Sequence, residues 1–396
     1  MNDHLKPQPV GGPLWTPTFR LLAIIFGFSL VIWIWRFAAG LGATTGLNQG
    51  YPWGIWIAIE VVTGTALGCG GYAMAFLVYL FNKGQYHPLV RPAVLTSALG
   101  YTIAAIAINL DVGRTLYIYK IPVALFWWNG HSVLLEVALC VMSYMAILWI
   151  ELAPALFEIW EKGSSAFLKG LAGFFGPLFK KLTIPILAVG LLLPTMHQSS
   201  LGALMLIGGN KVHGLWQTPW LPLLFLVSCI GMGYSVVIFE AILASIFFHR
   251  QRETAMLAKV GQVAGWVMLG YTIFRFVDIV LRGRLPLAFH FNIQSFMFWL
   301  EMIFFLGGSI ILLIPKQRES VGGQFNAATL LLLAGAVYRM DAYLVAYNPG
   351  SNWHYFPTVP EMLITIGLFC LEILAYIYLV KRYPILSGAS RAVSKA

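Results

Sequence analysis

The chain has 396 residues, of which 59% are hydrophobic and 10% are charged. Soluble domains average about 45–50% apolar and about 25% charged residues, so the composition excludes an ordinary soluble protein and indicates an integral membrane protein. The formal net charge of +10 belongs mostly to loops at an anionic lipid surface, which argues against nucleic-acid binding.

Apolar runs long enough to cross a bilayer as helices, about 20 residues each, recur along the whole chain. None shows the strict alternation in segments of about 10 residues that a transmembrane β-barrel requires. The predicted helices cover residues 20–40, 53–81, 92–112, 131–152, 182–206, 220–248, 257–281, 290–314, 326–346 and 358–380. We therefore expect an all-α integral membrane protein with about ten transmembrane helices.

Basic residues set the predicted orientation, because they concentrate in cytoplasmic connections. Seventeen of the 25 Lys and Arg residues lie in the two tails and the even-numbered connections, and five lie in the odd-numbered ones. The tails, residues 1–19 and 381–396, are therefore predicted to be cytoplasmic. We expect no cleavable signal, because the polar start leads into an apolar run that is long enough to span.

Residues 154–181, between the fourth and fifth predicted helices, combine aromatic residues with scattered lysines and glycines. This segment is too interrupted to span and is predicted to lie at the cytoplasmic interface. The four cysteines, Cys69, Cys140, Cys229 and Cys370, stand singly inside predicted helices. Their spacing predicts neither a disulfide framework nor an iron-sulfur cluster.

An internal repeat runs through the chain. GYTI at 100–103 precedes DVGR at 111–114, and GYTI at 270–273 precedes Asp278 and RGR at 282–284. The next predicted helix contains SVLLE ending at Glu136 in one case and SFMFWLE ending at Glu301 in the other. The repeat predicts two four-helix bundles, 53–206 and 220–346, in parallel orientation, with helices 20–40 and 358–380 flanking them.

Charged groups inside the predicted helices carry the functional signal, because a charge at the bilayer centre costs at least about 2.5 kcal/mol. The acids inside the helices or at their membrane ends are Glu60, Asp111, Glu136, Glu240, Asp278, Glu301, Asp341 and Glu372. A rise of about 1.5 Å per residue places the first bundle's polar groups toward the outer face and Glu240 about 30 Å along an inward helix, near the cytoplasm. The outer groups of the first bundle are Glu60, Asp111, Arg114, Glu136 and His197, and those of the second, at middle to outer depth, are Arg275, Asp278, Glu301, Arg339 and Asp341.

Some of these charges also have a structural interpretation. Asp111 with Arg114, and Arg275 with Asp278, stand three residues apart on a helix and can form ion pairs, which we favour for the second pair. Glu372 is interpreted as a contact with a neighbouring subunit or a backbone group. Glu136 and His197 have no partner nearby in sequence, and we interpret them as functional.

An imidazole and a buried carboxyl group can both exchange protons near neutral pH. Beside an apolar pocket they suit a quinone, a hydrocarbon ligand whose head takes up protons on reduction. Trp53 and Tyr101 are candidates for its lining, with Trp56, Trp127 and Trp128, although most aromatics at this density are interface anchors or packing.

Two other functions stay open on the residues alone. A b-type haem needs two axial histidines, and only His197 lies deep in a helix, while His131 and His290 lie at similar outer positions, so one interfacial haem remains an alternative. No G-x-x-x-x-G-K-[ST] loop supports ATP-driven transport, but a proton-coupled secondary transporter fits the repeat and the buried acids.

Several stretches resemble a known family. They are YPWGIWIAIE (51–60), FNKGQYHPLVRPAVL (81–95), INLDVGR (108–114), SVLLE (132–136), LLPTMHQSSLGAL (192–204), KVHGLWQ (211–217), VVIFE (236–240), and YNPG with YFPT (347–358). These resemble the membrane subunits of periplasm-facing Hyb-type nickel-iron uptake hydrogenases, within the broader NrfD and polysulfide-reductase membrane-subunit family. The likeness runs from about residue 45 to the C-terminal region.

The resemblance implies a ten-helix quinone-binding subunit of the bacterial inner membrane, without haem or iron-sulfur cluster of its own. It implies that electrons from hydrogen pass through the hydrogenase large and small subunits and a ferredoxin-like iron-sulfur subunit, on the periplasmic side, to a quinone, usually menaquinone. Glu136 and His197 then match positions expected around the quinone and its proton route, and Tyr101 and Glu240 match family polar positions.

We therefore expect the non-haem membrane subunit of a hydrogen:quinone oxidoreductase of anaerobic respiration, with no hydrogenase metal site in this chain and with proton translocation as a further hypothesis. Its alternative is the quinone subunit of another iron-sulfur-linked oxidoreductase. The residues expected around the quinone are Trp53, Glu60, Tyr101, Asp111, Arg114, Glu136 and His197, and those expected to move protons also include Glu240, Asp278, Glu301, Arg339 and Asp341.

Overall fold

The computed structural model describes residues 6–250 and 253–387. Within these ranges every regular element is a helix, and one isolated bridge joins Val212 to Tyr347. The outermost parts of both predicted tails, together with Arg252, Arg391 and Lys395, lie outside the described residues.

Ten helical spans in the described ranges are long and apolar enough to cross a membrane, which confirms the predicted class and number. They are α1 (Pro17–Ala39); Trp56–Leu80, built from η3 (Trp56–Thr63), α2 (Gly64–Leu67), α3 (Gly70–Ala75) and η4 (Phe76–Leu80); Gly84–Asp111, built from η5 (Gly84–Leu89) and α4 (Val90–Asp111); α6 (Val133–Trp160); α8 (Thr183–Ile207); α9 (Leu221–Phe247); α10 (Thr254–Leu281); α11 (Ile293–Leu313); Val321–Val345, built from α13 (Val321–Met340) and η10 (Asp341–Val345); and α14 (Val359–Arg382).

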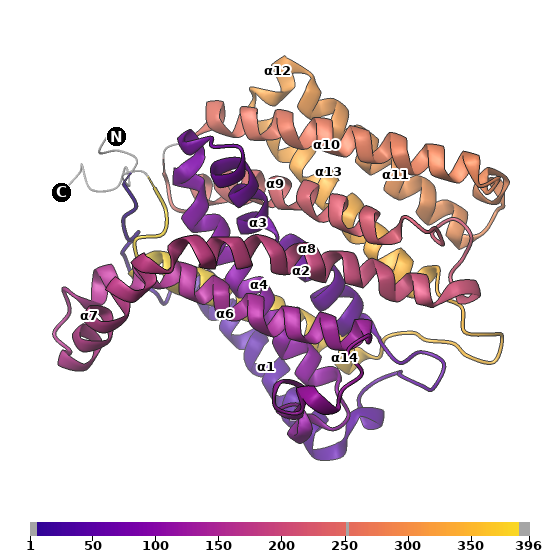
Figure 1. Cartoon of the computed structure of the whole chain (residues 1–396), viewed down its shortest axis with the longest axis horizontal. Helices are drawn as coiled ribbons and strands as arrows, with labels where there is room; N and C mark the ends of the chain where they lie inside the picture. The colour runs from indigo at the N-terminus through magenta and orange to yellow at the C-terminus, as the bar shows by residue number, and fades with distance from the viewer. Residues whose placement is uncertain (1–5, 251–252, 388–396) are drawn as a thin grey trace.

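Both described chain ends lie on one face of the molecule, where the backbone N–H of Gln8 donates to the carbonyl of Leu386 (Figure 1). We call this face the termini face and the opposite one the far face. The assignment of the termini face to the cytoplasm stays a prediction.

The segment between the fourth and fifth spans differs from the predicted interfacial segment 154–181. Helix α6 continues through Pro154 to Trp160, and a separate helix, α7 (Ala166–Lys181), follows. Proline removes one backbone donor but does not end a helix that neighbouring helices support. Helix α7 lies toward the termini face (Figure 1) and buries Ala172, while Phe167 and Phe174 stay exposed.

The spans pack as two groups of four. In the first group α4 packs against the Trp56–Leu80 span and α6, and α6 packs against α8; in the second, α9 packs against α10 and α13, and α11 packs against α10 and α13. Helices α1 and α14 pack against each other, and α14 contacts α4. Figure 1 shows the second group, in orange, beside the first, in violet. This packing agrees with the predicted fold class, whereas the domain boundaries along the chain stay a prediction.

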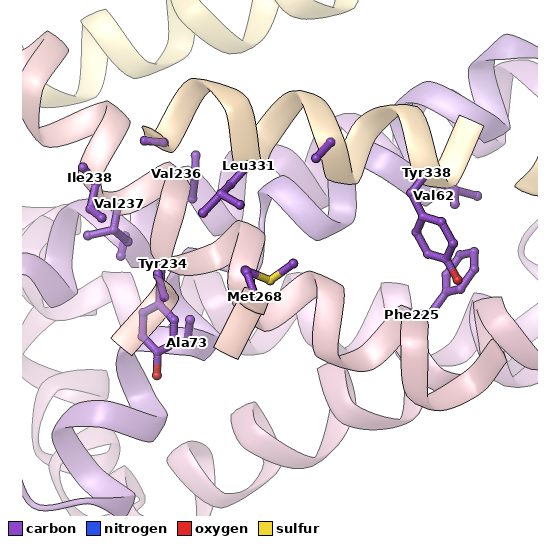
Figure 2. Close-up of a cluster of buried hydrophobic side chains, with 14 of the residues drawn as sticks. Val62, Ala73, Phe225, Tyr234, Val236, Val237, Ile238, Met268, Leu331 and Tyr338 are labelled. Carbon is purple, nitrogen blue, oxygen red and sulfur yellow. The ribbon is translucent and has the colours of Figure 1, made fainter. Parts of the chain in front are cut away.

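Helix α9 joins the two groups through a buried apolar core. Figure 2 shows Val236 and Phe225 of α9 among side chains of both groups, including Val62, Met268 and Tyr338. One close approach is at a glycine: a Cβ on Gly233 would lie 2.5 Å from the carbonyl oxygen of Cys69. Small residues permit such backbone contact between membrane helices.

Two spans contain π-helical turns that carry buried acids. The turn η3 holds Glu60, which is 2% exposed, and the turn η10 holds Asp341, which is fully buried. Wide turns of this kind often occur at functional sites. They also turn side chains away from the positions that a regular helical period predicts.

Candidate functional site

The centre of the candidate site is His197 on α8, which is fully buried. It lies 14 residues after Thr183 and 10 before Ile207, so it stands about 21 Å from the termini face. Its Nε2 lies 3.2 Å from the Thr65 hydroxyl, which also accepts from the Gln198 amide at 3.0 Å. The histidine ring makes an edge contact with Tyr101, with centroids 5.7 Å apart.

The hydrogen bonds of Thr65 determine the form of His197. The single hydroxyl proton of Thr65 is donated to the carbonyl of Val61. The Nε2–H of His197 therefore donates to the Thr65 hydroxyl, and Nδ1 of His197 carries the lone pair. That Nδ1 has no protein partner, and neither have the hydroxyl of Tyr101 and the amide oxygen of Gln198, among the described residues. Because unsatisfied buried polar atoms are costly, three of them together indicate a place for a polar ligand group.

The stretch LLLPTMHQSSLG (191–202) contains polar residues that bond within their own helix and others that face the neighbouring span. Thr195, Ser199 and Ser200 each hydrogen-bond to a carbonyl one turn earlier in the same helix. Such local bonds let hydroxyl residues sit in an apolar helix, and the Thr195 hydroxyl also lies 2.6 Å from that of Tyr72. His197 and Gln198 instead face the Trp56–Leu80 span, through Thr65.

Glu136 stands apart from this cluster. It lies in the first turn of α6, is partly exposed, and interacts electrostatically with Cys140 one turn on. In residues 6–250 and 253–387 no hydrogen bond or ion pair engages its carboxylate, so none links it to His197. Its repeat counterpart Glu301 lies eight residues into α11 and is fully buried, so the repeat matches in sequence but not in depth.

At the far face, Asp111 interacts with Arg36 rather than Arg114. The guanidinium of Arg36 donates to the carbonyls of Leu110 and Val112, at 2.7 and 2.9 Å, and lies near the Asp111 carboxylate. Arg114 is exposed, and no ion pair joins it to Asp111 in the described chain. A cation at the carboxyl end of α4 also complements the helix dipole.

Trp53 lies between the first group and the end of the second. Its indole N–H donates to the carbonyl of Tyr343 at 3.0 Å, and its ring centroid lies 4.9 Å from that of Tyr347. This residue therefore packs against η10 and its following loop rather than against the cluster around His197.

The ion pairs of the second group correct one prediction. Arg275 does not pair with Asp278; it pairs with Glu301 across the α10–α11 interface, and both are fully buried. Asp278 pairs with Arg282 at 2.8 Å, four residues along. The reason is depth: Glu301 is as fully buried as Arg275 and compensates its charge there, and it also accepts from the Trp216 indole at 3.3 Å.

Arg339 is a buried cation at the junction of the two groups. It donates to the carbonyls of Val62 and Phe225, at 2.9 and 2.6 Å, and to the hydroxyl of Ser228 at 3.2 Å. Its guanidinium also lies 4.7 Å from the Phe225 ring centroid. Among the described residues no carboxylate forms an ion pair with it, and it interacts electrostatically with His197. A positive charge held only by neutral groups favours an anion beside it.

Asp341, two residues after Arg339, is fully buried, and neither of its oxygens has a hydrogen-bond partner among the described residues. It interacts electrostatically with Glu301 and Arg275. The second group therefore holds a compact set of two acids and one cation, separate from the His197 cluster, and Arg339 lies between the two.

Sequence reasoning missed several polar neighbours. Thr65, Gln198 and Tyr144 belong to the His197 cluster, since the Tyr144 ring packs edge-on against Tyr101 at 4.6 Å. Gln198 had a visible signal, as an amide inside a spanning helix, whereas Thr65 had none, because hydroxyls are common in such helices. Glu151 was also missed, although it lies inside the fourth predicted span.

The comparisons with known proteins agree with this all-helical membrane architecture. Residues 43–345 match the family described as polysulphide reductase, NrfD. A protein of Escherichia coli strain K12, described as a probable Ni/Fe-hydrogenase 2 b-type cytochrome subunit, is 40% identical over 385 residues, covering 96% of this chain and 95% of the relative. The integral membrane subunit of menaquinone reductase from Nitratidesulfovibrio vulgaris is 27% identical over 363 residues, 85% of this chain and 84% of its own. A selenate reductase subunit of Mesobacillus selenatarsenatis is 21% identical over 429 residues, 94% of this chain and 94% of its own.

The words "b-type cytochrome" raise the question of haem. A haem held between helices needs two facing imidazoles, but Nε2 of His197 faces Thr65, and no second histidine contacts it in the described chain. His213 and His290 lie near each other at the far face, where burial and the neighbouring His290 lower the pKa of His213. The residues around His197 do not fit a bis-histidine haem, and the absence of haem stays a prediction.

Proposed function

This chain belongs to the NrfD family of polysulphide-reductase membrane proteins, and from that premise we propose that it is the quinone-reactive subunit of a respiratory nickel-iron hydrogenase complex. The chain is a multi-pass bacterial inner-membrane protein and a quinone-linked membrane subunit of an oxidoreductase. Menaquinone as substrate, hydrogen as electron source and coupled proton movement are the proposed parts.

The observation that carries the proposal is the His197 cluster beside Arg339. A quinone is reduced by two electrons and two protons, and its oxygens become anionic until they are protonated. The unpartnered Nδ1 of His197 and hydroxyl of Tyr101 are positioned to exchange protons with such oxygens. The uncompensated charge of Arg339 stabilises the anionic stage.

Electrons are proposed to enter from the far face. There a ferredoxin-like iron-sulfur subunit would connect the hydrogenase small and large subunits to this chain. The connections at that face expose large apolar side chains, including Leu116, Phe126 and Trp127, which are 84–96% exposed. Exposed apolar patches mark protein or membrane contacts, which supports docking at this face.

Glu136 is proposed as a second proton-exchanging group, closer to the far face than His197. The proposal rests on its place in the first turn of α6 and on a carboxylate that has no hydrogen bond or ion pair among the described residues. Because it lies outside the His197 cluster, its loss should affect a different step from the loss of His197.

The test is hydrogen-dependent reduction of a menaquinone analogue by the chain purified with its copurifying subunits. Positioned acid-base groups contribute about 10²–10⁴-fold, so His197→Ala and Glu136→Gln are each expected to lower quinone reduction at least about 100-fold. Hydrogen-dependent reduction of a soluble dye should persist, because it needs only the hydrogenase. Ser199→Ala is the matched control, since that hydroxyl bonds only to its own helix.

Quinone reduction at the wild-type rate in His197→Ala would show that the quinone binds elsewhere. His197 and its neighbours in LLLPTMHQSSLG would then serve only in helix packing. The second candidate is the same quinone chemistry fed by another iron-sulfur oxidoreductase, which the likeness to the menaquinone reductase and selenate reductase proteins favours. Identification of the copurifying subunits by mass spectrometry decides between the two donors.

A further inference from the structure

A cavity opens on the termini face between η5, α4, α9 and the segment after α14. Its volume is about 50 Å³, and its polar lining includes Glu240, Ser245, Arg250 and Glu253. Arg250 donates to the carbonyls of Gln8, Leu386 and Ser387, so both described chain ends border this opening. Burial raises the pKa of Glu253, whose carboxylate accepts from the Ser387 hydroxyl at 2.9 Å.

Glu240 forms the inner wall of the cavity. Its two carboxylate oxygens accept from the hydroxyls of Tyr376 on α14 and Thr96 on α4, at 2.6 and 2.7 Å. Seven residues separate it from the end of α9 at Phe247, which places it about 10 Å inside the termini face. Glu240 is thus reached from the cavity and held by two donors from neighbouring helices.

Glu372 lies one turn before Tyr376 on α14, about 15 Å from the termini face by its distance from Arg382. Its carboxylate interacts electrostatically with Glu240 on one side and with Glu60 on the other. Its interpretation as a subunit or backbone contact stays a prediction. Three acids on three different helices therefore follow one another through the membrane.

Glycines lie next to Glu372 on the side of the Trp56–Leu80 span. A Cβ on Gly100 would lie 3.6 Å from a Glu372 carboxylate oxygen and 3.5 Å from the carbonyl oxygen of Gly64 and the Cα of Gly68. These are van der Waals distances, so the glycines let the helices pack closely around the Glu372 carboxylate. Steps between carboxyl groups that exceed a hydrogen bond need intervening water, which the route requires here.

Glu60 ends the series. It is 2% exposed, and its Oε1 has no hydrogen-bond partner among the described residues. It lies about 30 Å from the termini face, 20 residues before Leu80. Thr65, the partner of His197, follows five residues later on the same span, in α2. The His197 cluster, at about 21 Å, lies between the depths of Glu372 and Glu60.

We propose that Glu240, Glu372 and Glu60 form a proton route from the termini-face cavity to the His197 cluster. The inference deepens the proposed function and rests on it. Hydrogen oxidation outside gives two protons and two electrons; the electrons and two protons from the termini face convert quinone to quinol. Each hydrogen molecule oxidised then separates two charges across the membrane. The route combines Glu240 of α9 with Glu372 of α14, a flanking helix, and does not use Glu301 or Asp341 of the second group.

The test uses the purified complex in liposomes that contain a menaquinone analogue. Hydrogen is added, and quinone reduction and membrane potential are followed, the latter with a voltage-sensitive dye. Glu372→Gln and Glu240→Gln are expected to lower the rate of potential formation at least tenfold, with reduction of a soluble dye by hydrogen unchanged. Glu372→Asp should restore part of it, and Glu319→Gln, an exposed acid at the termini face, should match the wild type.

The outcomes separate the two proposals. Slow quinone reduction in Glu372→Gln, or normal reduction without a potential, supports the route, because protons then no longer arrive from the termini face. Potential formation by Glu372→Gln at the wild-type rate, with an active wild type, overturns the route alone. A wild-type complex that reduces a soluble dye but no quinone overturns the proposed function, and the route with it.

Discussion

The buried pair between Arg275 and Glu301 gives a prediction that separates structural from functional charge. Both side chains are fully buried, and the carboxylate also accepts from the Trp216 indole. Removing one partner of a buried pair costs about 3–5 kcal/mol, because the other charge is left uncompensated, whereas replacing both with apolar residues is often neutral. Arg275→Met is therefore expected to raise the unfolding equilibrium constant by a factor of about 100 to several thousand.

The double variant Arg275→Met with Glu301→Leu is expected to approach wild-type stability. A surface pair supplies the control: Arg91 and Glu158 lie 2.6 Å apart with side chains 30% and 46% exposed, so Glu158→Gln should cost at most about 1 kcal/mol.

The chain contains its own reporters for this measurement. All four cysteines are free and buried, so a thiol-reactive fluorophore labels them only as the helices separate. A thermal scan in detergent should then show an early transition for Arg275→Met and a near-normal one for the double variant. Equal destabilisation in the single and double variants, or none in the single, would refute the argument from uncompensated charge. Normal quinone reduction by the double variant would also remove Glu301 from the proposed proton path.

Two further outcomes follow from the packing and the cavity. Gly233→Val should prevent the helices from packing, because even a Cβ there would lie 2.5 Å from the Cys69 carbonyl oxygen. Early thiol labelling in the same thermal scan would detect the loss of packing, and a wild-type transition would contradict the close approach. Burial raises the pKa of Glu253, so its contribution to stability is fully present below its unfolded pKa, about 4.3, and is lost as the pH rises through the raised value. The transition temperature of Glu253→Gln relative to the wild type should therefore rise as the pH increases above about 4.3, and a constant difference would contradict this.

The sequence predicted the class of fold well because lipid leaves few choices. Apolar runs of spanning length must be helices, and most of their ends fell within a few residues of the observed ones. The exceptions are the third span, which begins at Gly84 and not at 92, and α6, which continues through Pro154 to Trp160, beyond the predicted end at 152. The two GYTI stretches place Tyr101 and Tyr271 at buried positions, and neither hydroxyl has a hydrogen-bond partner in the described chain.

Side-chain partnership was much harder to predict. Helical spacing favoured Arg275 with Asp278, but the real partner is on the next helix, since tertiary depth outweighs a weak pairing along one helix. The π-turns at Glu60 and Asp341 change which face these acids occupy, and nothing in the sequence marks them. Glu372 could not be linked to Glu60 and Glu240 without knowing that α14 packs against α4.

The pairing of α1 with α14 has a consequence for biogenesis. Few residues of α1 are buried, yet its buried Ser29 lies so close to Gly367 that a Cβ there would contact it at 2.1 Å. The two helices are separated by about 320 residues of chain, which at about 5–20 residues per second means that α1 waits in the lipid for roughly 15–65 s before its partner is synthesised. Helix α1 is thus fully packed only after α14 has been synthesised. A nascent chain that stops before Val359 leaves Ser29 exposed to lipid, where quality-control proteases can distinguish it from a finished protein.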